Sequence, residues 1–527
     1  MKSESNRREK IDRTVVSAAQ MRAIEELVFE AGMPVAALME KVAGAIARRI
    51  CALYPSPMRV GILVGPGHNG GDALVVAREL HFQGYAVAIY RPFSKSKSLT
   101  QQHARYVESL GIELSDRPEG LFECDVIVDG LFGFGLTRAL KGDIAETIDR
   151  ITEASIPVVS IDLPSGLHTD TGKALGTAIR ATQTLCLGLW KLAFFQDCAL
   201  EYLGEVELID FDLPLKDIEA VLGTSPHLQR LTAATAKDAL PLPRPRRTHK
   251  YDRGHLLLVC GSSRYSGAAI LAGLGARSSG VGMLSVAVPE SLKPMLNERL
   301  PEALIIGCPE TETGAIERLS AEIDVDRYDA IACGPGLTKY AIHALEAVWG
   351  APCPILLDAD GLNILVQLGT FLPKEAPLLL AGESGLRGAQ TVFTPHPGEF
   401  RRLFPELVEH LEDAPTAAKA AAQQSGAIVV LKGARSAIAH PNGTVWLNAK
   451  STPALARGGT GDVLTGLAGG LMAQGAKQQD AIAPKVCAAV WWHAQAGILA
   501  AKERSQLGVD AFTLTQYLSR VSGEGRV

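Results

Sequence analysis

Short runs of apolar and β-branched residues recur along this chain and alternate with stretches of helical periodicity. In the first half these runs fall at residues 59–64, 85–90, 125–130 and 156–161. In the second half they fall at residues 255–260, 283–289, 328–334, 354–360, 391–396 and 427–433. Strands that alternate with helices are typical of a parallel sheet covered on both faces. The pattern therefore predicts an α/β fold in each half.

The remaining patterns set the predicted boundaries. Residues 15–49 carry helical periodicity with a break at Gly32-Met33-Pro34, so two helices are expected there. Residues 1–13 are polar, and we expect them to be mobile. Prolines accumulate over residues 214–245, where no strong strand pattern is present, and the alternation then restarts. We therefore predict one domain at residues 1–220 and a second, unrelated in its motifs, at residues 221–527.

Composition excludes several classes of function. The 52 basic and 57 acidic residues leave a formal net charge of −5, so no nucleic-acid partner is expected. The first ten residues lack an apolar signal core, and the longest apolar runs are too short or too rich in glycine and alanine to span a bilayer. The nine cysteines form no CxxC pair and are interpreted as reduced core residues. We therefore expect a cytoplasmic, homo-oligomeric protein that acts on small molecules without a membrane partner.

Three predicted strands of the first half end in glycine and polar residues. The strand at 59–64 continues into Gly65-Pro-Gly-His-Asn69-Gly-Gly-Asp72, the strand at 125–130 contains Asp129 near its end, and the strand at 156–161 is followed by Asp162 and Ser165. Because ligands of parallel sheets bind beyond the carboxyl ends of the strands, one shared pocket is expected. Asn69, Asp129 and Ser165 offer hard oxygen atoms that suit a monovalent or divalent cation. Asp72 could instead cap the following helix.

The segments AAQMRAIEELVFEAGMPVAALME, VGPGHNGGDALVVAREL, DVIVDGLFGFGL and VVSIDLPSG resemble the YjeF N-terminal domain family, the NAD(P)H-hydrate epimerases, over roughly residues 15–215. The resemblance implies a Rossmann-like parallel-sheet sandwich. It implies a potassium ion held by Asn69, Asp129 and Ser165, and acid–base chemistry by Asp162. Lys141 is a weaker candidate, because a solvated surface lysine explains it better. The implied substrate contacts are His68, Asn69, Gly70, Gly71, Asp72, Gly133, Phe134, Gly135, Leu136, Thr137, Arg138, Ala139 and Asp162.

Two residues depart from that family's usual pattern. His68 replaces the first of two asparagines in the glycine loop, and Lys41 interrupts the usual LMENAG sequence. An imidazole can replace an amide as a hydrogen-bond partner. Lys41 is expected to add a charge near the ligand. Either change could tune or weaken the epimerase, and a non-catalytic nucleotide-sensing domain is the alternative.

In the second half, the run Arg457-Gly-Gly-Thr-Gly461-Asp462 precedes an apolar segment that predicts a helix at residues 463–472. Glycines let successive N–H groups converge, and a helix start adds free N–H groups and its dipole, so the run suits a phosphate. A carboxylate at that place can take the proton of a hydroxyl that attacks the phosphate. The alternative is that Asp462 caps the helix. Arg457 would contact a phosphate or face solvent.

The predicted strand ends of the second half also carry glycine and polar residues, which implies one long cleft. These residues lie in the runs GPGL at 334–337, DADGLN at 358–363, TPHPGE at 394–399 and KGARS at 432–436. Together with GGTGD they resemble the YjeF C-terminal family, ribokinase-like dehydratases, over roughly residues 245–515. The resemblance implies an ADP-dependent, sometimes ATP-dependent, NAD(P)H-hydrate dehydratase that uses Mg²⁺ with ADP. The implied contacts are Ala268, Gly336, His396 and Asp462 for the hydrated nucleotide, and Lys432, Gly433, Ala434, Arg435, Ser436 and Gly461 for ADP. A satisfied loop histidine is the alternative for His396, and helix caps are the alternative for Asp358 and Asp360.

The two resemblances together predict a bifunctional enzyme. The first domain would interconvert the R and S epimers of NAD(P)H hydrate, and the second would dehydrate the S epimer to NAD(P)H at the expense of ADP, with Asp462 and Asp162 as the catalytic residues. The rival hypothesis is a ribokinase-like small-molecule kinase with a nucleotide-sensing first domain.

Overall fold

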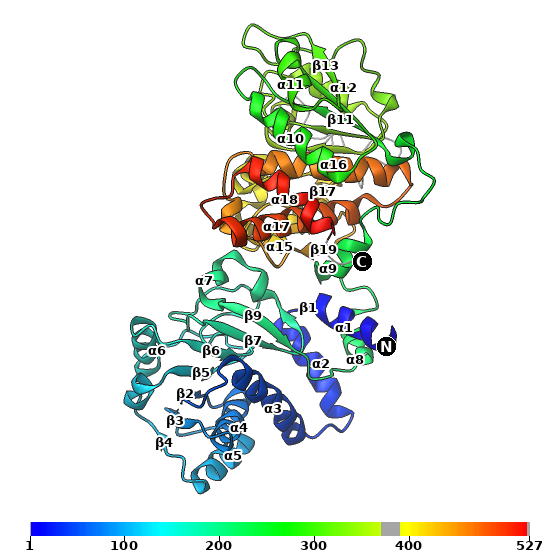
Figure 1. Ribbon diagram of the computed structural model, residues 1–527. Helices are drawn as coiled ribbons and strands as arrows, with labels where there is room; N and C mark the ends of the chain where they lie inside the picture. The colour runs from blue at the N-terminus through cyan, green and yellow to red at the C-terminus, as the bar shows by residue number, and fades with distance from the viewer. Residues whose placement is uncertain (1, 370–389, 524–527) are drawn as a thin grey trace. The chain divides into compact units, whose positions relative to one another are not determined.

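The computed structural model describes residues 2–369 and 390–523. The chain forms two compact units, Met1–Leu228 and Gln229–Val527 (Figure 1). The predicted division at residue 220 lies inside helix α8 (Leu215–Leu222), a few residues before the observed one.

The first unit is built on a parallel sheet in the order β4-β3-β2-β5-β6-β7-β9. Its strands are β2 (Arg59–Val64), β3 (Ala86–Tyr90), β4 (Leu114–Ser115), β5 (Val126–Gly130), β6 (Val158–Ile161), β7 (Gln183–Leu187) and β9 (Glu205–Ile209). A separate short parallel pair joins β1 (Val15–Val16) to β8 (Trp190–Lys191). The four strands predicted for this half are confirmed, and β4, β7 and β9 extend the sheet beyond them.

Both faces of this sheet are covered, as its doubly apolar strands require. Ile62 and Val64 pack into one core with α3 (Val35–Leu53) and α4 (His68–Phe82), whereas Leu63 packs into a second core with α6 (Asp143–Glu153). Figure 1 shows α6 on the opposite side of the sheet from α3 and α4. The remaining helices are α2 (Ala18–Glu30), α5 (Ser98–Ser109), α7 (Leu200–Leu203) and α8.

The expectation of a mobile N-terminus is wrong. Residues Lys2–Arg13 form helix α1. Ile11 is 1% exposed in the core of the first unit, and Arg7 is paired with Asp210. The polar composition concealed this helix because it needs only one buried apolar residue and a few ion pairs to dock.

The second unit is built on a ten-stranded sheet in the order β10-β19-β18-β17-β16-β15-β14-β11-β12-β13. The strands from β17 to β13 run parallel, and β18 is antiparallel to both β17 and β19. The strands are β10 (Leu228–Arg230), β11 (His255–Val259), β12 (Met283–Pro289), β13 (Leu304–Cys308), β14 (Ala330–Cys333), β15 (Ile355–Leu357), β16 (Thr391–Phe393), β17 (Ile428–Leu431), β18 (Ala437–Ala439) and β19 (Val445–Leu447). The six predicted strands are confirmed, but β10 lies in the proline-rich stretch where no strong strand was expected.

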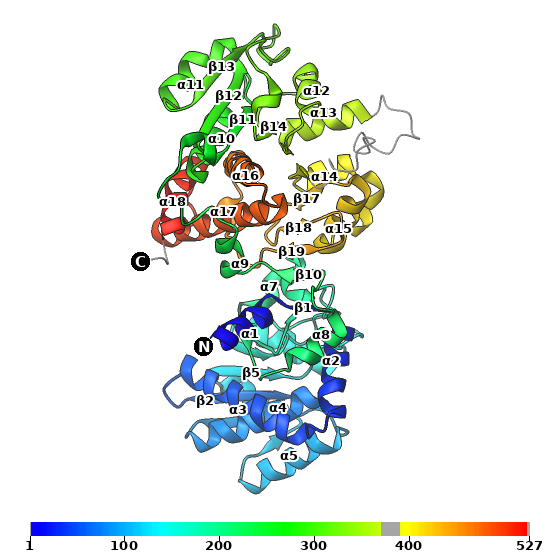
Figure 2. The ribbon, with the colours of Figure 1, turned by 90° about the vertical axis from the view of Figure 1, so that its right-hand side faces the viewer.

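Helices again cover both faces. One core joins β11 and β12 to α10 (Ser266–Ser279), α16 (Thr460–Lys477), α17 (Ile482–Arg504) and α18 (Ala511–Gly523). Figure 2 shows the opposite face covered by α12 (Ile342–Trp349), α13 (Ala359–Gly369), α14 (Pro397–Leu403) and α15 (Ala414–Ser425). The short helices α9 (Ala233–Asp238) and α11 (Lys293–Arg299) complete the unit. Across residues 2–369 and 390–523, no helix combines the length and the apolar character that a membrane span requires.

Each parallel sheet contains one point at which the strand order reverses. In the first unit the chain moves from β2 to β3 in one direction and from β5 to β6 in the other, so the reversal lies between β2 and β5. In the second unit it lies between β11 and β14. Loops leave such neighbouring strands on opposite faces and open a crevice at the carboxyl ends. The fold therefore places one candidate site in each unit.

Candidate functional sites of the two units

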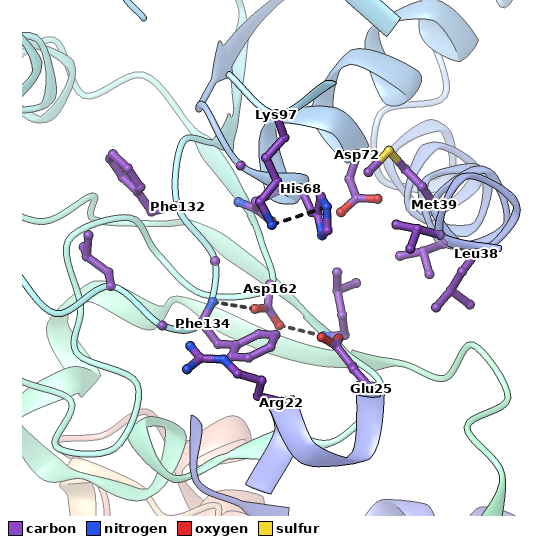
Figure 3. A pocket seen from close by; sticks show the side chains of 18 of the residues that line it. Arg22, Glu25, Leu38, Met39, His68, Asp72, Lys97, Phe132, Phe134 and Asp162 are labelled. Carbon is purple, nitrogen blue, oxygen red and sulfur yellow. Dashed lines mark hydrogen bonds between the residues drawn. The ribbon is translucent and has the colours of Figure 1, made fainter. Parts of the chain in front are cut away.

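A cavity of about 610 Å³ opens at the reversal point of the first unit (Figure 3). We call it the first-unit cavity. It is lined by α2, α3 and the start of α4, and by the segments that follow β5, β6 and β7. Among the predicted substrate contacts, its walls contain His68, Asn69, Asp72, Gly133, Phe134, Gly135, Leu136, Thr137, Arg138 and Asp162.

The glycine loop after β2 brings the start of α4 against the neighbouring strand. A Cβ at Gly65 would overlap the Leu131 carbonyl oxygen, and a Cβ at Gly70 would overlap the Gly65 carbonyl oxygen. Helix α4 therefore starts at His68 and directs free N–H groups toward the cavity. The His68 Nε2 lies 3.4 Å from the Lys97 Nζ (Figure 3). Burial, and then the Lys97 charge, lower the pKa of His68, so this wall is expected to present a neutral imidazole and a cation at neutral pH.

Asp162 directly follows β6 and has a φ of +70°, a left-handed conformation that is unusual for a residue other than glycine. Its side chain is 5% exposed and faces the cavity. The Phe134 amide donates a hydrogen bond to Oδ2 at 2.9 Å, and the Lys191 ammonium donates to Oδ1. Gly133 leaves room beside this carboxylate, since a Cβ there would lie 3.0 Å from Oδ2.

Lys191 is fully buried and forms an ion pair with Asp162. Burial would lower the pKa of Lys191, but the charge of Asp162 and the hydrogen bond to it raise the pKa above its ordinary value. Burial raises the pKa of Glu25 to about 7, with the Asp162 charge adding to the rise and the Lys191 charge opposing it. Burial, and then the charges of Asp162 and Glu25, raise the pKa of Asp72 well above its ordinary value. The cavity thus combines a charged pair with two carboxyl groups that favour the protonated state.

Two of the three predicted cation ligands, Asp129 and Ser165, are buried nearby, and the third, Asn69, is half-buried. Asp129 is fully buried, and its partners are two hydroxyl groups, of Ser160 and Ser165, and the backbone amides of Leu131 and Ser165. Burial raises the pKa of Asp129, and these hydrogen bonds partly offset the rise. The Asn69 Nδ2 is buried without a hydrogen-bond partner among the described residues. The carboxylate therefore faces neutral partners, a setting in which a bound cation would balance its charge.

In the second unit, the loops after β11 and β14 touch at the reversal point. Gly336 has a φ of +66°, and a Cβ there would lie 2.9 Å from the Ala268 Cβ. Two of the predicted substrate contacts are therefore neighbours. Beside them opens a cavity of about 790 Å³ whose walls include Tyr265, Thr338 and Asp360. The Asp360 Oδ2 accepts the Thr338 amide at 2.9 Å, so this carboxylate fixes the loop after β14 and does not cap α13.

A polar cluster lies at the start of α16. The Asp358 carboxylate is 2% exposed and accepts hydrogen bonds from the Lys432 Nζ and the Thr465 Oγ1, each at 2.7 Å. A Cβ at Gly461 would lie 3.6 Å from the Lys432 Nζ and 3.8 Å from the Asp358 Oδ2. We call Asp358, Lys432, Thr465 and Asp462 the second-unit cluster. It joins residues from the ends of β15 and β17 to the GGTGD run.

Asp462 lies in the first turn of α16, whose N-cap is Gly459, so the capping alternative for Asp462 is wrong. Burial raises the pKa of Asp462 to about 7, the Asp358 charge adds to the rise, and the Lys432 charge opposes it. Asp462 is therefore poised to take or give a proton near neutral pH. The buried His493 supports the backbone just before Asp462, because its Nε2 lies 2.8 Å from the Thr460 carbonyl oxygen.

His396 is the N-cap of α14. Its Nδ1 accepts the Gly398 amide at 2.9 Å, and its Nε2 lies 3.4 Å from the Glu399 Oε1. This histidine therefore has a structural role as a helix cap, and its side chain is 52% exposed, so its outer edge is accessible to a ligand. Arg457 donates to the Val509 carbonyl oxygen at 2.9 Å, so it ties the GGTGD run to the segment before α18.

Comparisons with known proteins match each unit to a protein family. A family model described as NAD(P)H-hydrate dehydratase matches residues 256–520, and one described as YjeF-related protein N-terminus matches residues 35–193. A bifunctional NAD(P)H-hydrate repair enzyme of Synechocystis sp. is 53% identical over 508 residues, covering 96% of this chain and 94% of the relative. The chain belongs to the family of bifunctional NAD(P)H-hydrate repair enzymes. The resemblance found in the sequence, and the predicted pairing of an epimerase with a dehydratase, are thereby confirmed.

Other members of the repair-enzyme family show the same full-length match. The Thermofilum pendens member is 35% identical and covers 92% of this chain. Among solved structures, the ADP/ATP-dependent NAD(P)H-hydrate dehydratase from Bacillus subtilis, co-crystallised with ATP and Mg²⁺, is 34% identical. It covers 55% of this chain and 96% of its own, with a TM-score of 0.45.

Not every predicted substrate contact of the repair enzyme's first unit lies in the wall of the first-unit cavity. Gly70 and Gly71 are buried and act through close backbone packing, and Ala139 is exposed outside the cavity walls. The expectation for Lys41 is wrong, because its Nζ lies 2.7 Å from the Asp212 Oδ2 and its side chain is not part of the cavity wall. Lys141 is exposed, as its surface interpretation predicted.

Two residues of the cavity, Glu25 and Lys191, escaped the sequence analysis. Lys191 stands alone in the apolar run LGLWKLAFF, and a lone lysine in such a run signals a buried, paired charge. Glu25 gave no comparable signal, because a helix surface ordinarily carries glutamates. Only the packing of α2 against the cavity distinguishes it from Glu30, and only its lower exposure distinguishes it from Glu26, which also lines the cavity.

Proposed function

We propose that the second unit performs the dehydration through the second-unit cluster. Asp462 would take the proton of the C6 hydroxyl of the S hydrate while that oxygen attacks the terminal phosphoryl group of ADP, which releases AMP. The C6–O bond would then break with phosphate as the leaving group, and loss of a proton from C5 would restore the double bond of NAD(P)H. The observation that carries this proposal is the raised pKa of Asp462 beside Gly461 and Lys432.

The ADP contacts stay predictions, and the geometry supports them. Lys432 to Ser436 follow β17, and the Lys432 ammonium already lies at the amide-rich start of α16, where phosphate charge would be favoured. When bound with ADP, Mg²⁺ would neutralise phosphate charge. Within residues 2–369 and 390–523, no three His, Cys, Asp or Glu side chains are grouped so that they could hold a metal ion. Phosphate oxygens and water would therefore supply most of the ligands of Mg²⁺.

Asp462→Asn tests this assignment. The variant should lose dehydration of the S hydrate by about 100-fold or more, because an amide cannot accept the proton, and it should still equilibrate the R and S hydrates. Equal loss of both activities with a preserved fold would overturn the division of labour. A stable phosphorylated hydrate, in place of free phosphate and renewed absorbance of reduced nicotinamide, would favour the kinase alternative.

We further propose that the first unit epimerises the hydrate in the first-unit cavity, with Asp162 facing the nicotinamide ring. Asn69, Asp129 and Ser165 would hold a potassium ion, because all three supply oxygen atoms and the buried Asp129 carboxylate has neutral partners. When bound, potassium would balance that charge and order the loop that carries Gly133. Replacing potassium by a bulky organic cation should lower both the epimerisation rate and the first unit's melting temperature. A lack of change in either would refute the cation site.

A cytoplasmic location and a homo-oligomeric state stay predictions of the sequence. Fractionation of the native source and light scattering of the full chain would test them.

A further inference from the structure

The Asp162 carboxylate is surrounded by donors. The Phe134 amide lies 2.9 Å from one oxygen, and the Lys191 ammonium and the Leu187 amide, at 3.4 Å, approach the other. An ammonium and backbone amides stabilise the charged form of a carboxylate. Asp162 is therefore suited to face a cation or to accept a proton. A carbon that exchanges its hydroxyl group between two faces also needs a group that donates a proton to the departing oxygen.

Glu25 has the properties of that donor. Its side chain lines the same cavity and points into it from α2 (Figure 3). Burial raises its pKa to about 7, so a large fraction carries a proton at neutral pH, and the proton can still be released. The charged and titratable groups that act on it come from several elements: Lys191 of β8, Asp162 after β6, Arg22 of α2 itself, Lys97 before α5 and Asp72 of α4.

One scaffold holds Glu25 and Lys191 together. Val16 of β1 pairs in register with Lys191 of β8. Ser17 follows at once and starts α2 through a capping box with Gln20, so the helix that carries Glu25 is anchored beside the strand that carries Lys191. Segments at opposite ends of the unit's sequence thus fix a carboxyl group and a buried ion pair around one cavity.

We propose that Glu25 is the proton donor of the epimerase and that Lys191 is a positioning residue which holds the Asp162 carboxylate in place within the same cavity. This inference rests on the proposed epimerase function of the cavity. Two carboxyl groups in contrasting environments, here one whose pKa is raised by burial and one that is paired with an ammonium, are a recurring arrangement for acid and base roles.

The proposed reaction balances in two steps. The Glu25 carboxyl gives its proton to the hydroxyl oxygen on C6, the C6–O bond breaks, water leaves, and the lone pair of ring nitrogen N1 forms an N1=C6 bond. Water then adds to the opposite face of C6, the electron pair returns to N1, and the Asp162 carboxylate takes the proton of that water. The two carboxyl groups regain their starting states by proton exchange with solvent, and their roles interchange in the reverse direction.

Glu25→Gln in the full chain, compared with Glu30→Gln, tests this proposal. Both substitutions remove one carboxylate from α2, but Glu30 is exposed and lies outside the cavity walls. Purified R hydrate is incubated without ADP, which keeps dehydration silent, and the epimers are separated by chromatography. We expect Glu25→Gln to lower the catalysed rate by about 100-fold or more, Glu30→Gln to match the unsubstituted chain, and both variants to dehydrate S hydrate normally when ADP and Mg²⁺ are added.

Three further readouts separate chemistry from structure. The epimerisation rate of the unsubstituted chain should fall above about pH 7 as Glu25 loses its proton. The Glu25→Asp variant should show the same fall. Any residual activity of Glu25→Gln should not depend on pH in this way. Epimerisation in isotopically labelled water should place one solvent oxygen on C6. Lys191→Met should lower kcat more than it raises KM, and Lys191→Arg should restore part of kcat.

The outcomes distinguish the inference from the function on which it rests. An unsubstituted chain that equilibrates the hydrates no faster than buffer overturns the epimerase function of the cavity. An active unsubstituted chain with an equally active Glu25→Gln variant, or epimerised product that retains its original oxygen, overturns the proposed proton donor alone. If the first unit of Glu25→Gln has lost its thermal transition, Glu25→Asp takes its place in the comparison. A normal epimerisation rate of Glu25→Asp that does not fall above about pH 7 then refutes the proposal.

Discussion

Asp462→Asn should abolish dehydration and at the same time stabilise the second unit. Burial and the neighbouring Asp358 charge raise the pKa of Asp462 to about 7, which means that the folded unit disfavours the charged carboxylate. Asparagine has nearly the same shape and carries no charge. The substitution therefore removes a destabilising charge that the proposed chemistry requires.

The magnitude and its pH dependence follow from the pKa. The difference between about 7 and the ordinary value of 3.8 corresponds to about 4 kcal/mol as an upper limit. Asp462 is partly exposed, so solvent screening reduces the expected gain to about 1–2 kcal/mol. Between those two pH values the unfolded chain binds fewer protons than the folded unit, so the stability of the unsubstituted unit falls as pH rises through this window. The gain in Asp462→Asn should be absent below about pH 4 and complete above about pH 7.

Thermal unfolding at about pH 8 and about pH 5.5 provides the assay, with Asp238→Asn, an exposed change in the same unit, as control. We expect the second-unit transition of Asp462→Asn to rise by about 4 °C at the higher pH, to rise less at the lower pH, and not to move in the control. A second unit that is less stable at the higher pH, or a gain that is equal at both, would refute the electrostatic reasoning, whatever the variant's activity.

Three further predictions concern neighbours of the two sites. Lys432→Met leaves the buried Asp358 carboxylate without its ammonium partner, so the free energy of unfolding of the second unit should fall by about 3 kcal/mol in chemical denaturation. The ADP concentration needed for half-maximal dehydration should also rise. Unchanged values of both quantities would contradict the role of Lys432 as the partner of Asp358 and of ADP. His493→Ala removes the contact with the Thr460 carbonyl oxygen, so the free energy of unfolding of the second unit should fall by about 1–3 kcal/mol. The dehydratase kcat should fall as well, while the epimerisation rate serves as the unaffected control. Lys41→Ala should leave the epimerase KM unchanged in steady-state assays, because this side chain lies outside the cavity wall; a clear rise in KM would place it at the ligand after all.

The two sheets and their glycine loops could be predicted because their determinants are local. Short continuous runs of apolar and β-branched residues specify strands that are buried on both faces. Gly65, Gly70 and Gly336 mark places where a backbone approaches too closely for a Cβ. Consecutive strand ends must meet at one edge of a parallel sheet, so the convergence of Asp162 with the glycine loop also followed from the order of the segments. The docked helix α1 could not be predicted, because its contacts lie at the far end of the unit's sequence.

The sequence by itself determined the fold class, the two domain families and the loops that surround each site, since these depend on residue type and spacing. Only the tertiary structure decided which charges meet. In the first unit, Lys191 is buried against Asp162, and Glu25 of α2 lines the same cavity. In the second unit, Lys432 and Thr465 donate hydrogen bonds to Asp358 near Asp462. Burial and charge pairing depend on residues far apart in the chain, so the proton affinities on which both proposed reactions depend arise only when the units fold.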